Sequence, residues 1–259
     1  CRFNHSTADL SKLDVTDATG TVVGFVPFTD VFRYLGSHVH WTLSDEFDIQ
    51  HRISAASAAF GALSSTLCSR RVNSTLRGQI YSTLVCSILL YGSECWALSQ
   101  ALVQQLQAFH NKCVRRMCFV TLQHCHLHRI SAATLDARLK LTGIQATIDS
   151  LRLGWAGHVA RMDHSRLPRR FLTSWVRAKR PIGRPRLSTA HCINDTIHRA
   201  DLNTENWVHL ANDRDEWRKL CRAVKPKVEK RGRRPAVLSS APAAIPAPPA
   251  TMPQPVLPP

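Results

Sequence analysis

Acidic side chains are scarce in this sequence. The chain has 259 residues, and 34 Lys and Arg against 18 Asp and Glu give a formal net charge of +16. The excess is uneven, since residues 1–151 carry a net charge of +3 and residues 152–234 a net charge of +13. A polyanion is the natural partner of such a chain, and the last third should supply most of the attraction.

Long apolar runs are missing as well. A bilayer span needs roughly 18 apolar residues, and the nearest stretch, "YSTLVCSILLYG", stops well short. We therefore expect no membrane partner. Nine cysteines at irregular spacing, with no signal peptide, predict reduced thiols and an intracellular location, cytoplasmic or nuclear. The first residue is Cys1 rather than Met, so we expect a fragment of a longer protein.

Common enzymatic signatures are absent too. The chain contains no Gly-x-Ser-x-Gly, His-Glu-x-x-His or Gly-x4-Gly-Lys pattern. The tightest acidic cluster, Asp213, Asp215 and Glu216, stands beside Arg214 and Arg218. Surface ion pairing explains that cluster better than acid-base chemistry does.

The hydrophobic pattern predicts a mainly α fold. Residues 12–39 show β-type alternation and predict a short antiparallel meander. Amphipathic helices are expected after Ser44, from Ser74 to about Gly92, and after Ser99, forming a bundle. The apolar face of the second should point inward, with Leu76, Ile80, Leu84, Ile88 and Tyr91.

Five further helices are expected after this bundle. They should cover residues 131–141, 144–162, 168–176, 188–198 and 205–224, the last one capped by Thr204. The Pro-rich sequence beyond Arg234 can propagate neither helix nor sheet, which predicts a disordered tail.

One basic segment, "KRPIGRPRL", is typical of an AT-hook. Two prolines hold it extended, and a glycine without a side chain would allow close approach to a narrow minor groove. The alternative is a basic linker that contacts phosphates without sequence preference. The residues expected to bind nucleic acid here are Lys179, Arg180, Gly183, Arg184 and Arg186.

A metal site is a further candidate. Cys113, Cys118, Cys125 and His128 follow one another at spacings that match no common zinc finger. Small buried thiols are the alternative interpretation of the three cysteines.

Several motifs in order resemble the C-terminal part of a LINE-type (non-LTR) retrotransposon reverse transcriptase. They are "VFRYLGSHV", "LVCSILLYGSECWAL", "LQAFHNKCVRRM", "LRLGWAGHVARMDHSRLP", "KRPIGRPRL" and "ANDRDEWRKL". The resemblance implies the end of a palm in residues 1–44, a helical thumb in 45–120 and a basic extension in 121–224. Residues 225–259 would form a basic and then Pro/Ala-rich tail.

The resemblance also implies roles for particular residues. Tyr34 and Gly36 would lie on a primer-grip hairpin, close to a primer strand. Arg70, Arg71, Arg115 and Arg116 would lie along a duplex backbone, where such contacts position without reading sequence. The expected partner is RNA, DNA or an RNA–DNA hybrid.

Polymerisation in this family requires Mg²⁺ held by paired palm aspartates. No adjacent Asp-Asp occurs in this chain, so we expect the fragment to hold no cofactor and to be inactive on its own. Two alternatives remain: a stand-alone AT-hook-like DNA-binding protein, or a non-functional remnant of a mobile element.

Overall fold

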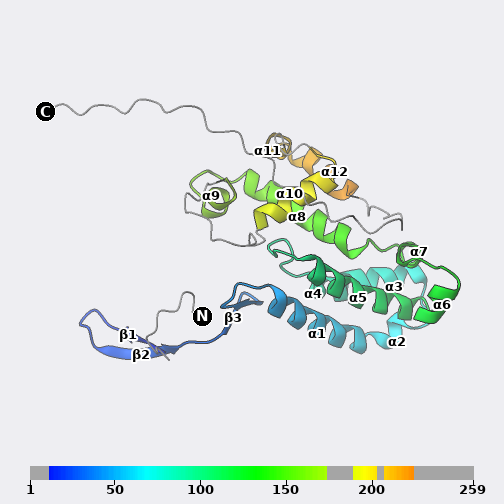
Figure 1. The fold of residues 1–259 in the computed structure, drawn as a ribbon, viewed down its shortest axis with the longest axis horizontal. Coiled ribbons are helices and arrows are strands. Elements are labelled where there is room, and N and C mark those ends of the chain that lie inside the picture. The colour runs from blue at the N-terminus through cyan, green and yellow to red at the C-terminus, as the bar shows by residue number, and fades with distance from the viewer. Residues whose placement is uncertain (1–11, 174–188, 203–206, 225–259) are drawn as a thin grey trace, which may run out of the picture. The chain divides into compact units, whose positions relative to one another are not determined.

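A computed structural model describes residues 12–173, 189–202 and 207–224 (Figure 1). The mainly α class is confirmed, with antiparallel strands at the N-terminal side and helices after them. The strands are β1 (Lys12–Thr16), β2 (Val22–Pro27), β3 (Val31–Tyr34) and β4 (Ser37–His40). None of the described helices is both long and apolar enough to cross a membrane.

The four strands form two separate hairpins instead of one continuous meander. β1 pairs only with β2, and β3 only with β4, both antiparallel, among the strands that the structure describes. The β3–β4 turn consists of Leu35 and Gly36, both with positive φ. This is the backbone conformation of a type I′ turn, which matches the twist of the strands it joins.

The helical part begins with α1 and continues to the last described residues. Its elements are α1 (Glu46–Ala62), α2 (Ser64–Leu67), α3 (Ser74–Ile80), the π-helix η1 (Tyr81–Cys86), α4 (Ser87–Leu89), α5 (Gln100–Met117), α6 (Leu122–Leu127), α7 (Ala132–Arg138), α8 (Ile144–Ala160), α9 (Leu167–Thr173), α10 (Thr189–Arg199), α11 (Trp207–Leu210) and α12 (Arg214–Ala223).

Short polar residues fix where several of these helices start. Asn73, Ser99, Thr121, Ser131 and Asp213 each accept a hydrogen bond from a backbone N–H in the first turn. Such caps satisfy N–H groups that lack a partner inside the helix.

The predicted inward face of the second helix is wrong by one position. Leu76, Leu84 and Tyr91 are exposed, whereas Tyr81, Val85 and Leu89 are fully buried. Ile80 and Ile88 lie between these faces and pack partly against the core. Two features rotate the segment: the π-helical turn of η1, and Gly78, whose missing side chain lets α3 approach the Leu139 carbonyl.

The predicted single helix over 205–224 is also corrected. The chain forms the short α11 and then α12, with a break at residues 211–213. Asp213 caps α12 by accepting hydrogen bonds from the N–H groups of Asp215 and Glu216. The expected cap Thr204 lies outside the described residues.

Among the residues that the structure describes, buried side chains form two hydrophobic cores. The first runs from Ile49 in α1 to Ile148 in α8, and the second from Leu153 in α8 to Cys221 in α12. Helix α8 therefore contributes to both. The domain limits at residues 44/45 and 120/121 stay predictions.

Candidate nucleic-acid interface

The tip of the β3–β4 hairpin is held by two side chains from the helical part. Tyr91 donates its hydroxyl to the Leu35 carbonyl at 2.9 Å, and Arg52 of α1 donates to the Gly36 carbonyl at 2.5 Å. The Arg52 guanidinium also lies 4.4 Å from the centre of the Tyr91 ring. Gly36 is required by its positive φ, since a Cβ there would make only an ordinary contact with the Tyr91 ring. Tyr34 is exposed.

Strand β4 of the same hairpin is tied to buried Asp48 of α1. One carboxylate oxygen accepts the backbone N–H of His38 at 2.9 Å, and the other accepts the indole N–H of Trp96 at 3.0 Å. The Arg52 guanidinium lies 3.6 Å from the first oxygen. The hairpin, α1 and the loop before α5 are thus joined at one carboxylate.

A second group of predicted residues gathers at the other end of α1. Arg70, after α2, lies over the Phe119 ring at 5.2 Å, just beyond the end of α5. Arg116, in the last turn of α5, lies over the Phe60 ring of α1 at 5.1 Å. With their sequence neighbours Arg71 and Arg115 they form what we call the basic end: Arg70, Arg71, Arg115 and Arg116.

Almost no acidic residue accompanies the basic end. Between Ile49 and Leu135 the sequence contains a single carboxylate, Glu94. The basic end therefore has few negative charges near it in sequence to cancel its positive potential. This long acid-poor stretch is a sequence signal that motif reading alone misses.

The structure separates the predicted residues into two groups. Strand β3 lies next to the start of α1 (Figure 1), and its hairpin, which carries Tyr34 and Gly36, contacts Asp48 and Arg52 there. Arg116 of the basic end contacts Phe60 in the last turn of α1. At 1.5 Å rise per residue, Asp48 and Phe60 are about 18 Å apart along the helix axis.

Several arginines are engaged inside the fold. In addition to Arg52, four arginine side chains donate to backbone carbonyls: Arg77 to Met117, Arg152 to Trp96, Arg161 to Ala211 and Arg169 to Ala160. Three of these carbonyls lie at or next to the end of a helix, where backbone acceptors lack helical partners. These charges stabilise the fold and contribute less to an external interface than the formal net charge suggests.

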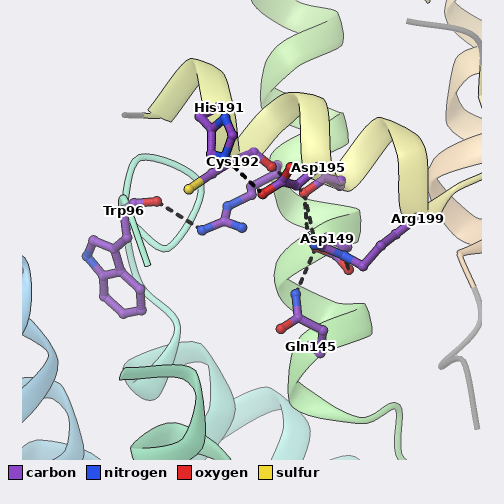
Figure 2. A network of polar contacts seen from close by, with 9 residues as sticks. Trp96, Gln145, Asp149, His191, Cys192, Asp195 and Arg199 are labelled. Atoms are coloured by element: carbon purple, nitrogen blue, oxygen red, sulfur yellow. Dashed lines mark hydrogen bonds and ion pairs between the residues drawn. The ribbon is translucent and has the colours of Figure 1, made fainter. Parts of the chain in front are cut away.

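A polar network connects α8 with α10 (Figure 2). Asp149 accepts hydrogen bonds from Gln145, Thr196 and both Nε and Nη2 of Arg199, the last at 2.6 Å. The bond to Asp149 raises the pKa of the Arg199 guanidinium. With its oxygens occupied and its side chain buried, Asp149 links two helices and is not available as a base.

Another buried chain of polar groups joins Tyr81, His110 and Asp136. The Tyr81 hydroxyl lies 3.1 Å from His110 Nδ1, and His110 Nε2 lies 3.0 Å from Asp136 Oδ1. Burial is the main reason why the pKa of Tyr81 is raised far above its usual range. Since His110 is only 1% exposed, a substrate could not reach the ring, and the arrangement stabilises the fold.

The candidate metal ligands behave as separate side chains. Cys113 and Cys125 are buried, the Cys118 thiol donates to the Leu135 carbonyl, and exposed His128 lies against His124. Within the described ranges, no three His, Cys, Asp or Glu side chains form a group that could hold a metal ion.

The acidic cluster at the start of α12 stabilises that helix through a cap and an ion pair. Asp213 is the cap, and hydrogen bonds from the Glu216 and Asp215 N–H groups lower its pKa. Asp215 pairs with Arg218 at 2.9 Å, which confirms ion pairing at the surface.

The segment "KRPIGRPRL", with Lys179, Arg180, Gly183, Arg184 and Arg186, lies outside the described residues, so its AT-hook-like role stays a prediction. Thr189, which opens α10 just after it, donates its hydroxyl to the Cys95 carbonyl at 3.2 Å.

Comparison with known proteins gives one informative result. The chain is 28% identical over 193 residues to a transposon-derived protein of Caenorhabditis elegans, and the match covers 73% of this chain and 68% of that protein. This similarity suggests a mobile-element origin. No protein-family model and no solved structure matches the chain.

Proposed function

We propose that this chain binds nucleic acid as the C-terminal part of a LINE-type reverse transcriptase. The observation that carries the proposal is the basic end, where Arg70 and Arg116 lie on aromatic rings of the helical part, each beside a second arginine, within an acid-poor stretch. Guanidinium groups bind phosphate oxygens well, and contacts of this kind provide affinity without reading sequence.

The arrangement around α1 supports a duplex as the ligand. Asp48, which contacts the hairpin, and Phe60, which contacts the basic end, are about 18 Å apart along the helix axis. At 3.4 Å per base along one strand, that distance corresponds to about five nucleotides. The hairpin would approach the primer near its end, and the basic end would hold the duplex backbone farther along.

The mobile-element origin is compatible with this proposal and also with a remnant that has lost its role. The finer assignment, to a polymerase that grips template and primer, rests on the motif order and on the two ends of α1.

The test is a binding titration of the full chain. We expect fluorescence anisotropy with a labelled RNA–DNA hybrid to show affinity that falls steeply with salt, because bound phosphates release counterions. Replacing Arg70 and Arg71 by Ala should weaken binding roughly tenfold and reduce the salt slope by about two, one for each lost phosphate contact.

The matched control keeps the charge. Arg70→Lys with Arg71→Lys should bind nearly as the wild type does, since both side chains act at phosphate as positive charges. Both residues are exposed, so circular dichroism should show intact folding in each variant. Affinity that is absent, or flat with rising salt, overturns the proposal.

A further inference from the structure

Two exposed aromatic rings lie side by side on β3. Phe32 is 49% exposed and Tyr34 is 60% exposed. Their ring centroids are 6.4 Å apart and their planes differ by 28°. Since alternate residues of a strand share a face, the pair forms a small aromatic surface on one side of the hairpin.

The residue at the hairpin tip is unusual for its position. Leu35 has a φ of 46° and is 76% exposed. Type I′ turns favour Asn, Asp or Gly here, because a side chain such as Leu is strained at positive φ. The fold by itself gains little from an apolar side chain that is strained and faces water, so Leu35 points to a contact outside the chain.

The aromatic surface is held in place before any ligand arrives. Tyr91 and Arg52 each bind a carbonyl of the turn, and Asp48 binds the His38 N–H on the other strand. Holding a surface in its binding conformation reduces the entropy lost on association.

The charge of the hairpin narrows the class of ligand. Residues 31–40 contain Arg33, His38 and His40 but no Asp or Glu. Arg33 is exposed, and strand alternation places it on the face opposite the two rings. Flat exposed rings on a hairpin that carries a cation and no carboxylate suit single-stranded nucleic acid, where bases stack and phosphates meet cations.

We propose that the β3–β4 hairpin is a base-stacking platform for unpaired nucleotides. Phe32 and Tyr34 would stack on successive bases of a single strand, and Leu35 would contact the next base beyond the tip. The inference rests on the proposed nucleic-acid function but adds a different ligand. The hairpin would bind exposed bases, whereas the basic end would bind phosphates.

The test compares a single strand with a blunt duplex, using the full chain. The probe is a twelve-nucleotide DNA or RNA oligomer containing 2-aminopurine, whose fluorescence falls when the base stacks. With Phe32→Leu and Tyr34→Leu together, we expect single-strand affinity to fall roughly tenfold or more and the quenching to disappear. Leucine keeps apolar area and removes the π-face, and duplex affinity should change less than about twofold.

Two further variants sharpen the result. Phe171→Leu alters an exposed aromatic residue on α9 and should leave both affinity and quenching unchanged. Leu35→Gly relieves the positive φ, so it should raise Tm while weakening single-strand binding.

The outcomes are separable. Unchanged quenching and affinity in the Phe32/Tyr34 double variant, with duplex binding intact, would overturn the platform alone. A chain that binds neither probe overturns both proposals. Equal loss of single-strand and duplex binding in a folded double variant also overturns the platform, because its effect would then not concern unpaired bases.

Discussion

At the residue scale, two glycines of α8 have opposite surroundings. A side chain added at Gly154 would meet nothing within 4 Å, whereas one at Gly157 would lie 2.0 Å from the indole nitrogen of Trp217. That indole donates to the Leu153 carbonyl at 2.8 Å. Gly157 is therefore required for the close approach of α12 to α8.

We expect Gly157→Ala to lower the free energy of unfolding by about 2–4 kcal/mol, since the indole must move and its hydrogen bond is lost. Gly154→Ala, three residues away on the same helix, should be neutral or stabilise by up to about 1 kcal/mol, because Ala favours the helix. Urea unfolding monitored by circular dichroism measures both. Equal effects of the two substitutions would contradict the packing of Trp217 on Gly157.

The roles of individual arginines could not be predicted from sequence. Arg70 precedes α3 and Arg77 lies in its last turn, yet Arg70 is exposed and Arg77 is buried with a bond to the Met117 carbonyl. That carbonyl is forty residues away in the chain, so only the tertiary fold decides which guanidinium reaches it.

At the scale of elements, the start of α12 depends on one side chain. Asp213 accepts two backbone N–H groups, and they lower its pKa from the usual 3.8. Replacing Asp213 by Ala should lower Tm, because both N–H groups lose their acceptor. Asp213→Asn should retain most of the stability, since the amide oxygen can accept the same bonds.

The same cap predicts a pH dependence. Because the folded pKa is depressed, the contribution of the charge is present above the unfolded value and is lost as the pH falls through the lower folded value. The Tm advantage of the wild type over Asp213→Asn should therefore shrink between neutral pH and about pH 3. An advantage that grows on acidification would contradict this linkage.

The sequence predicts which segments are helices more reliably than it predicts which face of a helix is buried. The 3.6-residue period identified most helical segments after residue 44, though not α6, and it placed Leu76 and Leu84 inside where the structure exposes them. Both faces of that segment carry apolar residues, so hydrophobicity could not choose between them. The choice depends on Gly78 beside Leu139 and on the π-helical turn, which are tertiary effects.

At the scale of the whole molecule, the chain should bind nucleic acid and synthesise none. With a primer-template, Mg²⁺ and deoxynucleotides, we expect the full chain to give no primer extension above a protein-free control, because it contains no adjacent aspartates. A gel assay with an active reverse transcriptase as the positive control measures this. Extension that depends on Mg²⁺ would contradict the assignment.

The residues of the candidate interface could be predicted from the sequence, but their positions relative to one another could not. Charge and motif order indicated the arginines and the hairpin, while nothing in the sequence placed Arg70 beside Phe119 or Arg116 beside Phe60. Those neighbours come from α1 packing against α5, a contact between segments about fifty residues apart.

Helix α1 fixes both the separation and the relative rotation of the hairpin contacts and the basic-end contact. Because one helix carries the hairpin contacts at Asp48 and the basic-end contact at Phe60, each residue inserted between them would lengthen the span by about 1.5 Å and turn one end about 100° relative to the other. A single insertion would therefore change the relative orientation of the two surfaces. Seven added residues would complete nearly two turns and nearly restore that orientation, over a longer tract of ligand.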